Sequence, residues 1–459
     1  MSTTNAARER VEKLLDDNSF VELGAAVTAR STEFNIKEID TPSDGVITGY
    51  GLINGSLVYV YSQDASVLGG SIGEMHAKKI VNIYEMALKM GAPVIGIIDS
   101  VGLRLQESVD GLDAFGKIFQ SQAMVSGVIP QISVIYGQCG GGLSVIAKLS
   151  DIVLMESEDA KLFVNSPNTI DGNKTLDTAS SEYQSKHGNV DIVASDDDLM
   201  AKARDIISIL PSNNDDEAMD YESQDDLNRA SEGIEGSAPS EALKVIADDG
   251  FLIEMKKDYA PCMFTGFIKL NGATVGVFAN NKDKVCANGF KKAADFVKLC
   301  DAFEIPILTL TDIEGFEESE TTESYSMDSV SKLVYSLANA TVPKVNVITG
   351  KAVGTAGIVM NSKSLGADIV YAWPNASVSM MDADKAVKIM YADEIAKGED
   401  VSQITAEYNA LQANIEKAAS RGYVDTIINP VDTRKYIIGA FEMLYSKYEG
   451  TFEKKHGTK

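Results

Sequence analysis

The sequence contains an internal repeat, and this repeat constrains the fold more than any other feature. Three blocks recur in the same order: "TGYGLING" at 48–55 with "TGFIKLNG" at 265–272, then 78–102 with 291–315, then 128–142 with 341–355. The first pair is shifted by 217 residues and the other two by 213, so a four-residue difference in one loop accounts for the change. The chain is therefore predicted to be two copies of one fold.

Each copy alternates strands with helices. The strands are short apolar runs bounded by Gly and Pro, and amphipathic segments lie between them. This pattern predicts an α/β fold of stacked ββα or βαβ units, with mostly parallel sheets that helices cover on both faces. Asp99 and Asp312 each end a strand, and open α/β folds place ligands at such strand ends.

The repeat also predicts the domain organisation. We expect a first half at residues 1–210 and a second half at 242–459. Between them, residues 211–241 are acidic and rich in Ser, Asn and Gly, which is typical of a mobile or surface-wrapped linker. Residues 172–210 are predicted to be a helical tail of the first half. The stretch 400–446, before a basic end, has apolar positions at helical spacing and is predicted to be the helical tail of the second half.

The composition excludes several classes of protein. The formal charge is −26, so there is no basic surplus to bind nucleic acid. The start, "MSTTNAARERVEKLL", is charged and amphipathic rather than a signal peptide, and no apolar run could span a membrane, so we expect a cytoplasmic protein. The four cysteines lie far apart and the three histidines share no helix face, so neither a disulfide framework nor a metal site is expected.

In each copy a strand runs into a turn of small residues and then a helix. The turns are "QCGGG" at 138–142 and "KAVGTAG" at 351–357. Small residues let a ligand approach the backbone, and N–H groups at a helix start have no partner within the helix. The Lys-Ser/Thr pair of a phosphate-binding P-loop is absent after the first turn. Two such turns suit two oxyanions, such as a thioester enolate, although close helix–strand packing is an alternative explanation of the glycines.

Several segments are similar, in order and spacing, to the carboxyltransferase subunits of biotin-dependent acyl-CoA carboxylases and decarboxylases. The most specific are "SVLGGSIGEMHAKKI" (66–80) and "SKSLGADIVYAWP" (362–374), and the resemblance covers roughly 8–160 and 245–395. It implies two tandem crotonase-like domains, each a ββα spiral. It also implies that carboxybiotin, on a separate carrier protein, exchanges CO2 with the α-carbon of a short-chain acyl-CoA, with biotin's own N1 as the base.

The resemblance implies roles for individual residues. N–H groups of the 139–142 turn stabilise the developing biotin enolate, and those of the 354–356 turn stabilise the thioester enolate. The catalytic residues it implies are Gly140, Gly141, Gly142, Gly354, Thr355 and Ala356. The cofactor-binding residues it implies are Ser66, Leu68, Gly69, Gly70, Ser71, Lys78, Arg104 and Cys139. The first half is placed on the acyl-CoA side and the second half on the biotin side.

The resemblance further implies partners. They are the acyl-CoA, a biotin carboxyl carrier protein and a biotin carboxylase. It also implies a homo-oligomer built from dimers, up to a hexamer, in which the first half of one subunit meets the second half of another.

Three other functions stay open. The chain could serve a biotin-dependent decarboxylase. A biotin-free hydratase or isomerase of the crotonase type would need a side-chain acid and base, for which Glu107 and Glu314 are candidates. An inactive scaffold is suggested by Val101 and Leu103, which depart from the family's Asp-Ser-Gly-Gly-Ala-Arg pattern. The acyl chain, the direction of the reaction and the identity of the partner subunits are also left open.

Overall fold

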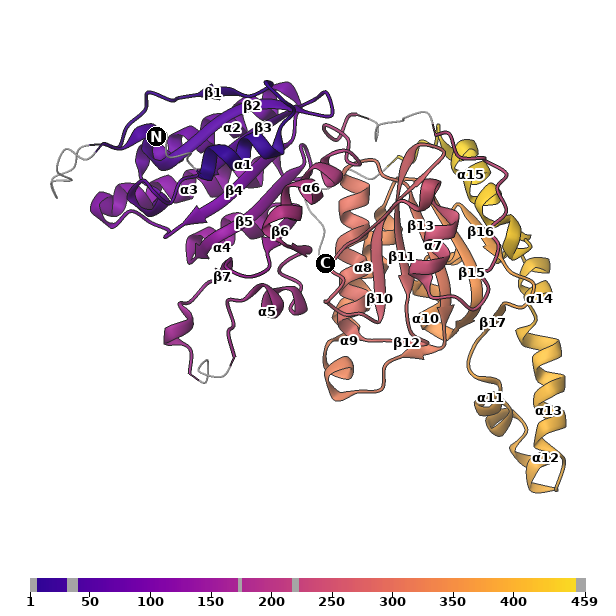
Figure 1. Ribbon diagram of the computed structural model, residues 1–459. Coiled ribbons are helices and arrows are strands. Elements are labelled where there is room, and N and C mark those ends of the chain that lie inside the picture. The colour runs from indigo at the N-terminus through magenta and orange to yellow at the C-terminus, as the bar shows by residue number, and fades with distance from the viewer. Residues whose placement is uncertain (1–5, 31–39, 172–175, 217–222, 451–459) are drawn as a thin grey trace. The chain divides into compact units, whose positions relative to one another are not determined.

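The computed structural model describes residues 6–30, 40–171, 176–216 and 223–450 (Figure 1). The chain divides into two compact units, Met1–Met219 and Asp220–Lys459, which we call the N-terminal and C-terminal units. This division falls inside the segment predicted as an acidic linker. The basic end of the chain lies outside the described residues from 451 onward.

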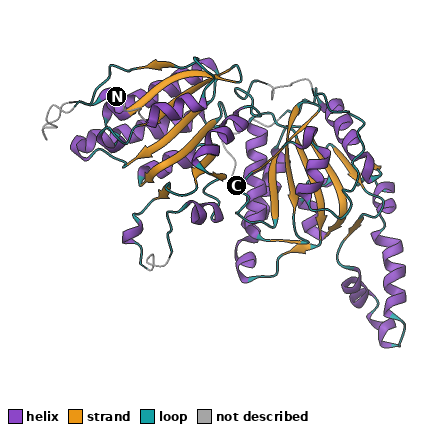
Figure 2. Cartoon of the chain, viewed as in Figure 1, coloured by secondary structure: helices purple, strands orange, loops and turns teal. Residues whose placement is uncertain are grey.

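The N-terminal unit is an eight-stranded sheet with helices packed on it (Figure 2). Its strands are β1 (Val21–Leu23), β2 (Val46–Ile53), β3 (Ser56–Gln63), β4 (Val94–Ser100), β5 (Gln131–Gly140), β6 (Ile152–Glu156), β7 (Lys161–Phe163) and β8 (Ile192–Ala194). Its helices are α1 (Ala6–Leu14), α2 (Glu74–Met90), α3 (Ser108–Val125), α4 (Gly142–Leu149), α5 (Ser181–Lys186) and α6 (Asp196–Ile207). The strand order is β1-β2-β3-β4-β5-β6-β8, and β7 pairs with the end of β5.

The C-terminal unit repeats this plan. Its strands are β9 (Leu252–Glu254), β10 (Met263–Leu270), β11 (Ala273–Asn280), β12 (Lys284–Val285), β13 (Ile307–Ile313), β14 (Gly315–Phe316), β15 (Lys344–Val353), β16 (Ile369–Ala372), β17 (Ser377–Ser379) and β18 (Thr426–Ile427). Its helices are α7 (Pro239–Ile246), α8 (Ala287–Ala302), α9 (Glu320–Asn339), α10 (Gly354–Val359), α11 (Ala383–Met390), α12 (Ala392–Ala396), α13 (Val401–Tyr408), α14 (Ile415–Ser420) and α15 (Thr433–Leu444).

The two main sheets have equivalent strand orders. In the C-terminal unit the order is β9-β10-β11-β13-β15-β16-β18, with β17 paired to β15 just as β7 pairs with β5. Both sheets begin with three antiparallel strands and continue as parallel strands. The predicted α/β class and internal duplication are therefore confirmed. The extra strands β12 and β14 form a separate two-stranded sheet.

Helix α2 shows how the sequence produces these layers. Its buried side chains include Ile80, Ile83, Tyr84 and Ala87, a spacing of three and four residues that puts them on one face. The helix ends at Gly91, which has φ 60° and closes the last turn in the left-handed conformation that glycine tolerates. The buried face then packs into the core formed with β3 and β4.

The segments predicted as helical tails also contain short strands. In 172–210 the described part has helices α5 and α6, but β8 lies between them and pairs in parallel with β6. In 400–446, β18 lies between α14 and α15 and pairs with β16. Each tail thus adds an edge strand to its sheet, because a short apolar run within a polar stretch can complete a parallel ladder.

The hairpin of the N-terminal unit is held by an aspartate and an arginine. Strands β2 and β3 are joined by Asn54-Gly55, and both turn residues have positive φ, as a tight two-residue turn requires. Asp16 accepts hydrogen bonds from the two turn N–H groups at 3.1 and 2.9 Å. Arg204 of α6 pairs with Asp16 at 2.8 Å and donates to the carbonyl of Leu14 at 2.7 Å. We call this set the Asp16–Arg204 clasp.

The C-terminal unit has the same arrangement. Asp248 accepts from the two N–H groups of the Asn271-Gly272 turn at 3.1 and 2.8 Å. Arg434 of α15 pairs with Asp248 at 2.6 Å and donates to the carbonyl of Ile246 at 2.6 Å. This Asp248–Arg434 clasp shows that the duplication extends to both ends of each unit, beyond the three blocks found in the sequence.

A strand irregularity sets where the first small-residue turn begins. The pairing of β4 with β5 changes register between Ile98 and Ser100. The carboxylate of Asp99 fills the space there, and a side chain at Gly137 of β5 would overlap it. Arg10 holds the other oxygen of Asp99 at 2.9 Å. The end of β5 is therefore turned away from regular pairing, toward helix α4.

The second turn begins in the same way. The pairing of β13 with β15 changes register between Thr311 and Ile313. The carboxylate of Asp312 fills the space beside Gly350 and accepts a hydrogen bond from the Lys351 N–H at 2.7 Å. The predicted importance of the two strand-ending aspartates thus has a structural basis, since each one shapes the start of a turn.

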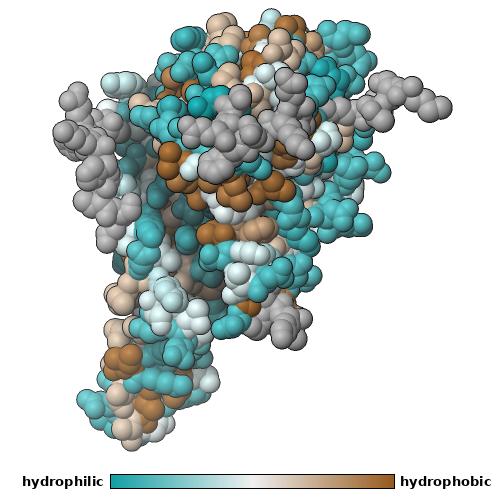
Figure 3. All heavy atoms as spheres, turned by 90° about the vertical axis from the view of Figure 1, so that its left-hand side faces the viewer, coloured by the Kyte–Doolittle hydropathy of each residue, from teal (hydrophilic) through white to brown (hydrophobic). Residues whose placement is uncertain are grey.

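The face drawn in Figure 3 is mostly polar, with apolar side chains in patches. No helix within the described ranges is both long and apolar enough to cross a bilayer.

Candidate active site

The first small-residue turn connects β5 to α4, as the sequence predicts. Gly141 has φ 59° and ψ −126°, which a residue with a side chain rarely adopts. Its N–H donates to the carbonyl of Phe163 at 2.9 Å, and its carbonyl accepts from the Ser144 N–H and hydroxyl. Gly142 is the first residue of α4, so its N–H has no acceptor within the helix. The Gly142 N–H is therefore a donor that this turn can offer to an oxyanion.

This turn lies at a cavity of about 730 Å³ in the N-terminal unit, which we call the first cavity. The residues that line it are Ser100, Val101, Gly102, Leu103, Leu105, Leu112, Phe115, Gly116, Phe119, Gln138, Gly140, Gly141, Gly142, Phe163 and Val164. Most of these side chains are apolar, and among these lining residues there is no Asp, Glu, His, Cys, Lys, Arg or Tyr. The first cavity therefore contains backbone donors and apolar surface but no side-chain acid or base of its own.

The sequence predicted ligands at the end of β4 and named Arg104 in the loop after it, but it did not assign Gly102 to the site. The bend between β4 and β5 brings Gly102 beside the first turn, and a side chain at Gly102 would be 3.8 Å from the Gly140 carbonyl. Gly102 has φ 97°, and its N–H is bonded to the Ser100 hydroxyl at 3.0 Å. The Asp-x-x-Gly pattern shared by the two strand ends (Asp99 to Gly102 and Asp312 to Gly315) was the available signal.

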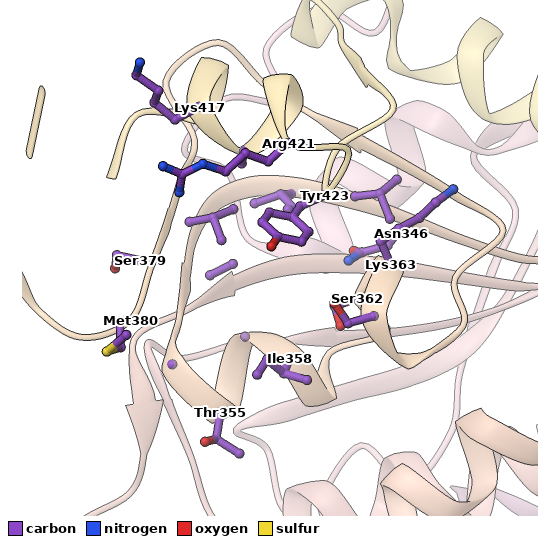
Figure 4. A pocket seen from close by; sticks show the side chains of 18 of the residues that line it. Asn346, Thr355, Ile358, Ser362, Lys363, Ser379, Met380, Lys417, Arg421 and Tyr423 are labelled. Carbon is purple, nitrogen blue, oxygen red and sulfur yellow. The ribbon is translucent and has the colours of Figure 1, made fainter. Parts of the chain in front are cut away.

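The second turn connects β15 to α10 and lies at a cavity of about 530 Å³ in the C-terminal unit, the second cavity (Figure 4). Gly354 has φ 56°, and it lines the cavity together with Thr355. The third predicted residue of this turn, Ala356, is 1% exposed and does not line it. The structure thus brings two of the three predicted residues to the second cavity.

The second cavity differs from the first in its polar and cationic side chains. Asn346, Ser362 and Ser379 contribute amide and hydroxyl groups. Lys417 of α14 and Arg421, which directly follows α14, lie on the side of the cavity away from Thr355 (Figure 4). The second cavity therefore suits an anionic ligand better than the first does.

The segment predicted to bind CoA packs along the loop of the first cavity. Leu68–Gly70 is a short 3-10 turn, and the Gly69 carbonyl accepts from the Val101 N–H at 3.0 Å. A side chain at Gly70 would be 2.5 Å from the Asp99 carbonyl, so this position requires glycine. Ser66 is exposed, whereas Leu68 and Gly69 are half-buried.

Arg104 does not face the first cavity. Its guanidinium is 1% exposed and pairs with Asp44 at 2.7 Å and Glu107 at 2.9 Å. It also donates to the backbone carbonyl of Ser71 at 2.6 Å and to its hydroxyl at 3.2 Å. Arg104 thus anchors the predicted CoA-binding segment through its hydrogen bonds to Ser71, and its side chain does not line the first cavity.

The remaining predicted binding residues lie in different environments. Lys78 is exposed on α2, whereas its neighbour Lys79 is buried, with its ammonium on the carbonyls of Ser43 and Val46. Burial lowers the pKa of Lys79 to about 8. Cys139 is fully buried, and burial raises the pKa of its thiol. Of these residues, Lys78 is the one with a side chain that can reach a ligand in solvent.

Neither candidate glutamate lies in a turn cavity. Glu107 is 2% exposed, and its second oxygen accepts from the Glu74 N–H at 2.6 Å. Glu314 pairs with Lys351 at 2.5 Å and lines a different cavity. Among the described residues, no group of three or more His, Cys, Asp or Glu side chains could hold a metal ion.

Comparison with known proteins identifies the family. The model of the carboxyl transferase domain matches residues 3–458. The chain belongs to the carboxyl transferase domain family. The predictions of an acyl-CoA carboxyltransferase of the biotin-dependent type, and of the tandem crotonase-like fold, are thereby confirmed. Its substrate is a CoA ester.

Relatives with two different names resemble this carboxyltransferase to the same degree. The propionyl-CoA carboxylase beta chain of Roseobacter denitrificans is 40% identical over 472 residues, covering 98% of this chain and 92% of the relative. The methylmalonyl-CoA decarboxylase subunit alpha of Veillonella parvula is 40% identical over 473 residues, with the same coverage. Transcarboxylase 12S, solved as a hexamer with methylmalonyl-CoA bound, has a TM-score of 0.94 at 36% identity, covering 98% of this chain and 91% of that one.

Proposed function

We propose that this carboxyltransferase moves a carboxyl group between carboxybiotin and the α-carbon of a short-chain acyl-CoA, of the size of propionyl-CoA. The observation that carries the proposal is the duplicated turn: each unit has a bent strand, a small-residue turn and a helix start at a cavity. Two such sites supply one backbone donor set for each of the two carbonyl oxygens on which negative charge develops.

The contrast between the cavities assigns one ligand to each. The first cavity is lined by Leu, Phe and Val side chains, which suit a short acyl chain, so we assign the thioester to it and to the Gly142 N–H. The second cavity has Lys417 and Arg421, whose charge would attract the carboxylate of carboxybiotin. The first turn then stabilises the thioester enolate, and the second turn stabilises the biotin enolate. The sequence resemblance implies the opposite pairing.

The first cavity also argues against a hydratase or isomerase. Such an enzyme needs a positioned side-chain acid or base within about 3 Å of the proton it moves. The side chains that line the first cavity include none, and Glu107 is held by Arg104 outside it. When bound, biotin supplies both the transferable carboxyl group and the proton acceptor. The chain then has to bind, orient and exclude water.

We further propose that the site works in an oligomer with separate partner chains. Three apolar side chains at the rim of the first cavity, Val101, Leu105 and Leu112, are 61–79% exposed. Exposed apolar groups around a cavity are typical of a surface that another chain covers. We expect a homo-oligomer, built from dimers and up to a hexamer, with the biotin carrier and the biotin carboxylase as separate chains.

The central experiment follows decarboxylation of methylmalonyl-CoA by the purified protein with added free biotin. We expect loss of the carboxyl group that depends on biotin. Turnover of an enoyl-CoA by hydration, without biotin, would support the hydratase. An absence of turnover together with an absence of CoA-ester binding would support the scaffold. Because the decarboxylase relatives are as similar as the carboxylase relatives, the direction in the cell is tested separately, by identifying the subunits that copurify with the chain.

The assignment of ligands has its own test. Leu112→Ala is expected to raise KM for the acyl-CoA several-fold and leave that for free biotin unchanged. The paired substitution of Lys417 and Arg421 by Gln is expected to raise KM for free biotin and leave that for the acyl-CoA unchanged. The reverse result would exchange the two assignments without affecting the proposed reaction.

A further inference from the structure

Two cysteines lie in contact beside a cavity that neither turn uses. The Sγ atoms of Cys262 and Cys286 are 2.7 Å apart, although the residues are 24 positions apart in the chain. Both are free thiols, and both line a cavity of about 650 Å³ in the C-terminal unit. The other residues that line this cavity are Pro261, Lys282, Asp283, Lys284, Glu314 and Glu317.

The backbone holds the pair together. Cys262 directly precedes β10, and Cys286 caps the start of α8. The Asn281 N–H donates to the Cys262 carbonyl at 2.9 Å, and its side-chain amide donates to the Pro261 carbonyl at 3.2 Å. The Cys286 N–H also points at the Cys262 sulfur, at 3.4 Å. Because these bonds fix both chain segments, the contact between the sulfurs is a property of the fold.

The two thiols have different reactivities. A hydrogen bond from the Cys262 thiol, helped by backbone N–H groups at the start of α8, lowers the pKa of Cys286 below that of an ordinary thiol. The same hydrogen bond, together with burial, raises the pKa of Cys262. Cys286 is half-buried, whereas Cys262 is 5% exposed. Cys286 is thus placed as the attacking thiolate and Cys262 as the resolving thiol.

We propose that Cys262 and Cys286 are a site of reversible disulfide formation, driven by a low-molecular-weight disulfide. The Cys286 thiolate attacks one sulfur of that disulfide, forms a mixed disulfide and releases one thiolate. Cys262 then attacks the Cys286 sulfur, loses its proton to solvent and releases the second small thiolate. The protein loses two hydrogen atoms and is oxidised, while the small disulfide is reduced to two thiols.

The bond would fasten a segment that reaches the second turn. The loop before Cys286 contains β12, which pairs with β14, and the backbone carbonyl of Asp283 accepts from the Glu314 N–H at 2.7 Å. Glu314 in turn pairs with Lys351, at the start of the second turn. Oxidation therefore ties the start of β10 to the strand pair beside that turn, and it is expected to raise the temperature at which the C-terminal unit unfolds.

The test uses the full chain and oxidised glutathione at pH 7.5. Thiols are counted in denaturant, and non-reducing peptide maps identify the bonded residues. We expect four free thiols to fall to two, a peptide joining Cys262 to Cys286, a higher unfolding temperature, and complete reversal by a dithiol reductant. None of these readouts depends on carboxyl transfer. They therefore test the disulfide independently of the proposed function.

Three variants make the test specific. Cys262→Ser is expected to stop at the mixed disulfide on Cys286, and Cys286→Ser to lose thiols at least about tenfold more slowly. Cys300→Ala is the matched control, because Cys300 is fully buried, and it should still lose two thiols. A bond that involves Cys139 or Cys300, a bond between two chains, or oxidation of Cys286→Ser at the wild-type rate would overturn the proposal.

Discussion

The two clasps have the same geometry but differ in burial. In each, an aspartate binds both N–H groups of an Asn-Gly turn and an arginine closes the contact from a helix near the end of the unit. The side chains of Asp16 and Arg204 are 29% and 27% exposed, whereas those of Asp248 and Arg434 are fully buried. Loss of the arginine is therefore expected to lower the free energy of unfolding by different amounts in the two units. Water can replace the lost partner in the exposed clasp but not in the buried one.

The largest expected effect is on stability, from the buried clasp. Arg434→Ala leaves the Asp248 carboxylate buried without its cation, and we expect a loss of about 3–5 kcal/mol in the free energy of unfolding. Arg204→Ala removes the equivalent cation from a partly exposed site and should cost about 1 kcal/mol or less. Urea unfolding of the two variants measures both losses.

The control for this pair is Lys435→Ala. Lys435 is next to Arg434 but exposed, and it pairs with Asp432 at 2.7 Å. Its loss should change stability by about 0.5 kcal/mol or less. Equal losses for Arg204→Ala and Arg434→Ala would show that burial does not distinguish the two clasps.

The next effect concerns the turns, where the repeat aligns Gly142 with Thr355. A side chain at Gly142 would lie 2.8 Å from the Phe115 ring, so Gly142→Ala must displace either the ring or the turn. Because misplacement of a catalytic donor by about 1 Å can cost about 10²-fold in rate, we expect a loss of that order in biotin-dependent decarboxylation. Thr355 already carries an exposed side chain, and Thr355→Ala should cost less than about tenfold.

Unchanged thermal unfolding in both variants is the control for correct folding. A small effect of Gly142→Ala together with a large effect of Thr355→Ala would contradict the role of the Gly142 N–H as a catalytic donor.

A smaller effect is expected where an aspartate packs on a glycine. Gly137→Ala would overlap the carboxylate of Asp99 and should cost about 1–3 kcal/mol of stability, as other overpacked sites do. The double variant Gly137→Ala with Asp99→Ala removes the overlap and is expected to recover part of that loss. A double-mutant cycle without coupling would show that the strand bend does not depend on this contact. Gly350→Ala with Asp312→Ala gives the matched cycle in the other unit.

The last prediction is a pH dependence confined to the N-terminal unit. Burial lowers the pKa of His76 to about 3, and its neutral ring lies between the Asp44 carbonyl and Gln63. The repeat aligns His76 with Gly289, so the C-terminal unit has no histidine at the equivalent position. The unfolded chain binds this proton below about pH 6.5 and the folded one does not, so stability falls by about 1.4 kcal/mol per pH unit between 6.5 and 3.

Because burial raises the pKa of Asp151 to about 7 and acts in the opposite direction, the measurement is a difference between two proteins. The stability of wild type minus that of His76→Asn, followed by urea unfolding from pH 7.5 to 5, should decrease as the pH falls. A constant difference would contradict the neutral buried histidine.

The order of elements and the two turns could be predicted because their signals are local. Apolar periodicity, Gly and Pro at the strand ends and the repeated blocks depend on residues close together in the chain. The same holds for the helix starts after Gly141 and Val353. These signals place a turn on the correct side of a strand without knowledge of any distant contact.

The features that were missed depend on distant contacts. The Asp16–Arg204 pair joins residues 188 positions apart, and the Gly102 loop reaches the first turn only through the bend in β4. Arg104 stands beside a predicted binding motif, but its sequence position does not reveal the two carboxylates that bury it. Lys78 and Lys79 are adjacent, yet helical geometry points one toward solvent and the other inward.

Each clasp has a consequence for how a chain of this kind can arise. Asp16 lies near the beginning of its unit and Arg204 near its end, so the clasp brings the entry and exit of the polypeptide to the same hairpin. A module whose entry and exit are neighbours can be copied in tandem without rearranging its interior. The second copy then needs only a short stretch of new sequence to continue from the first.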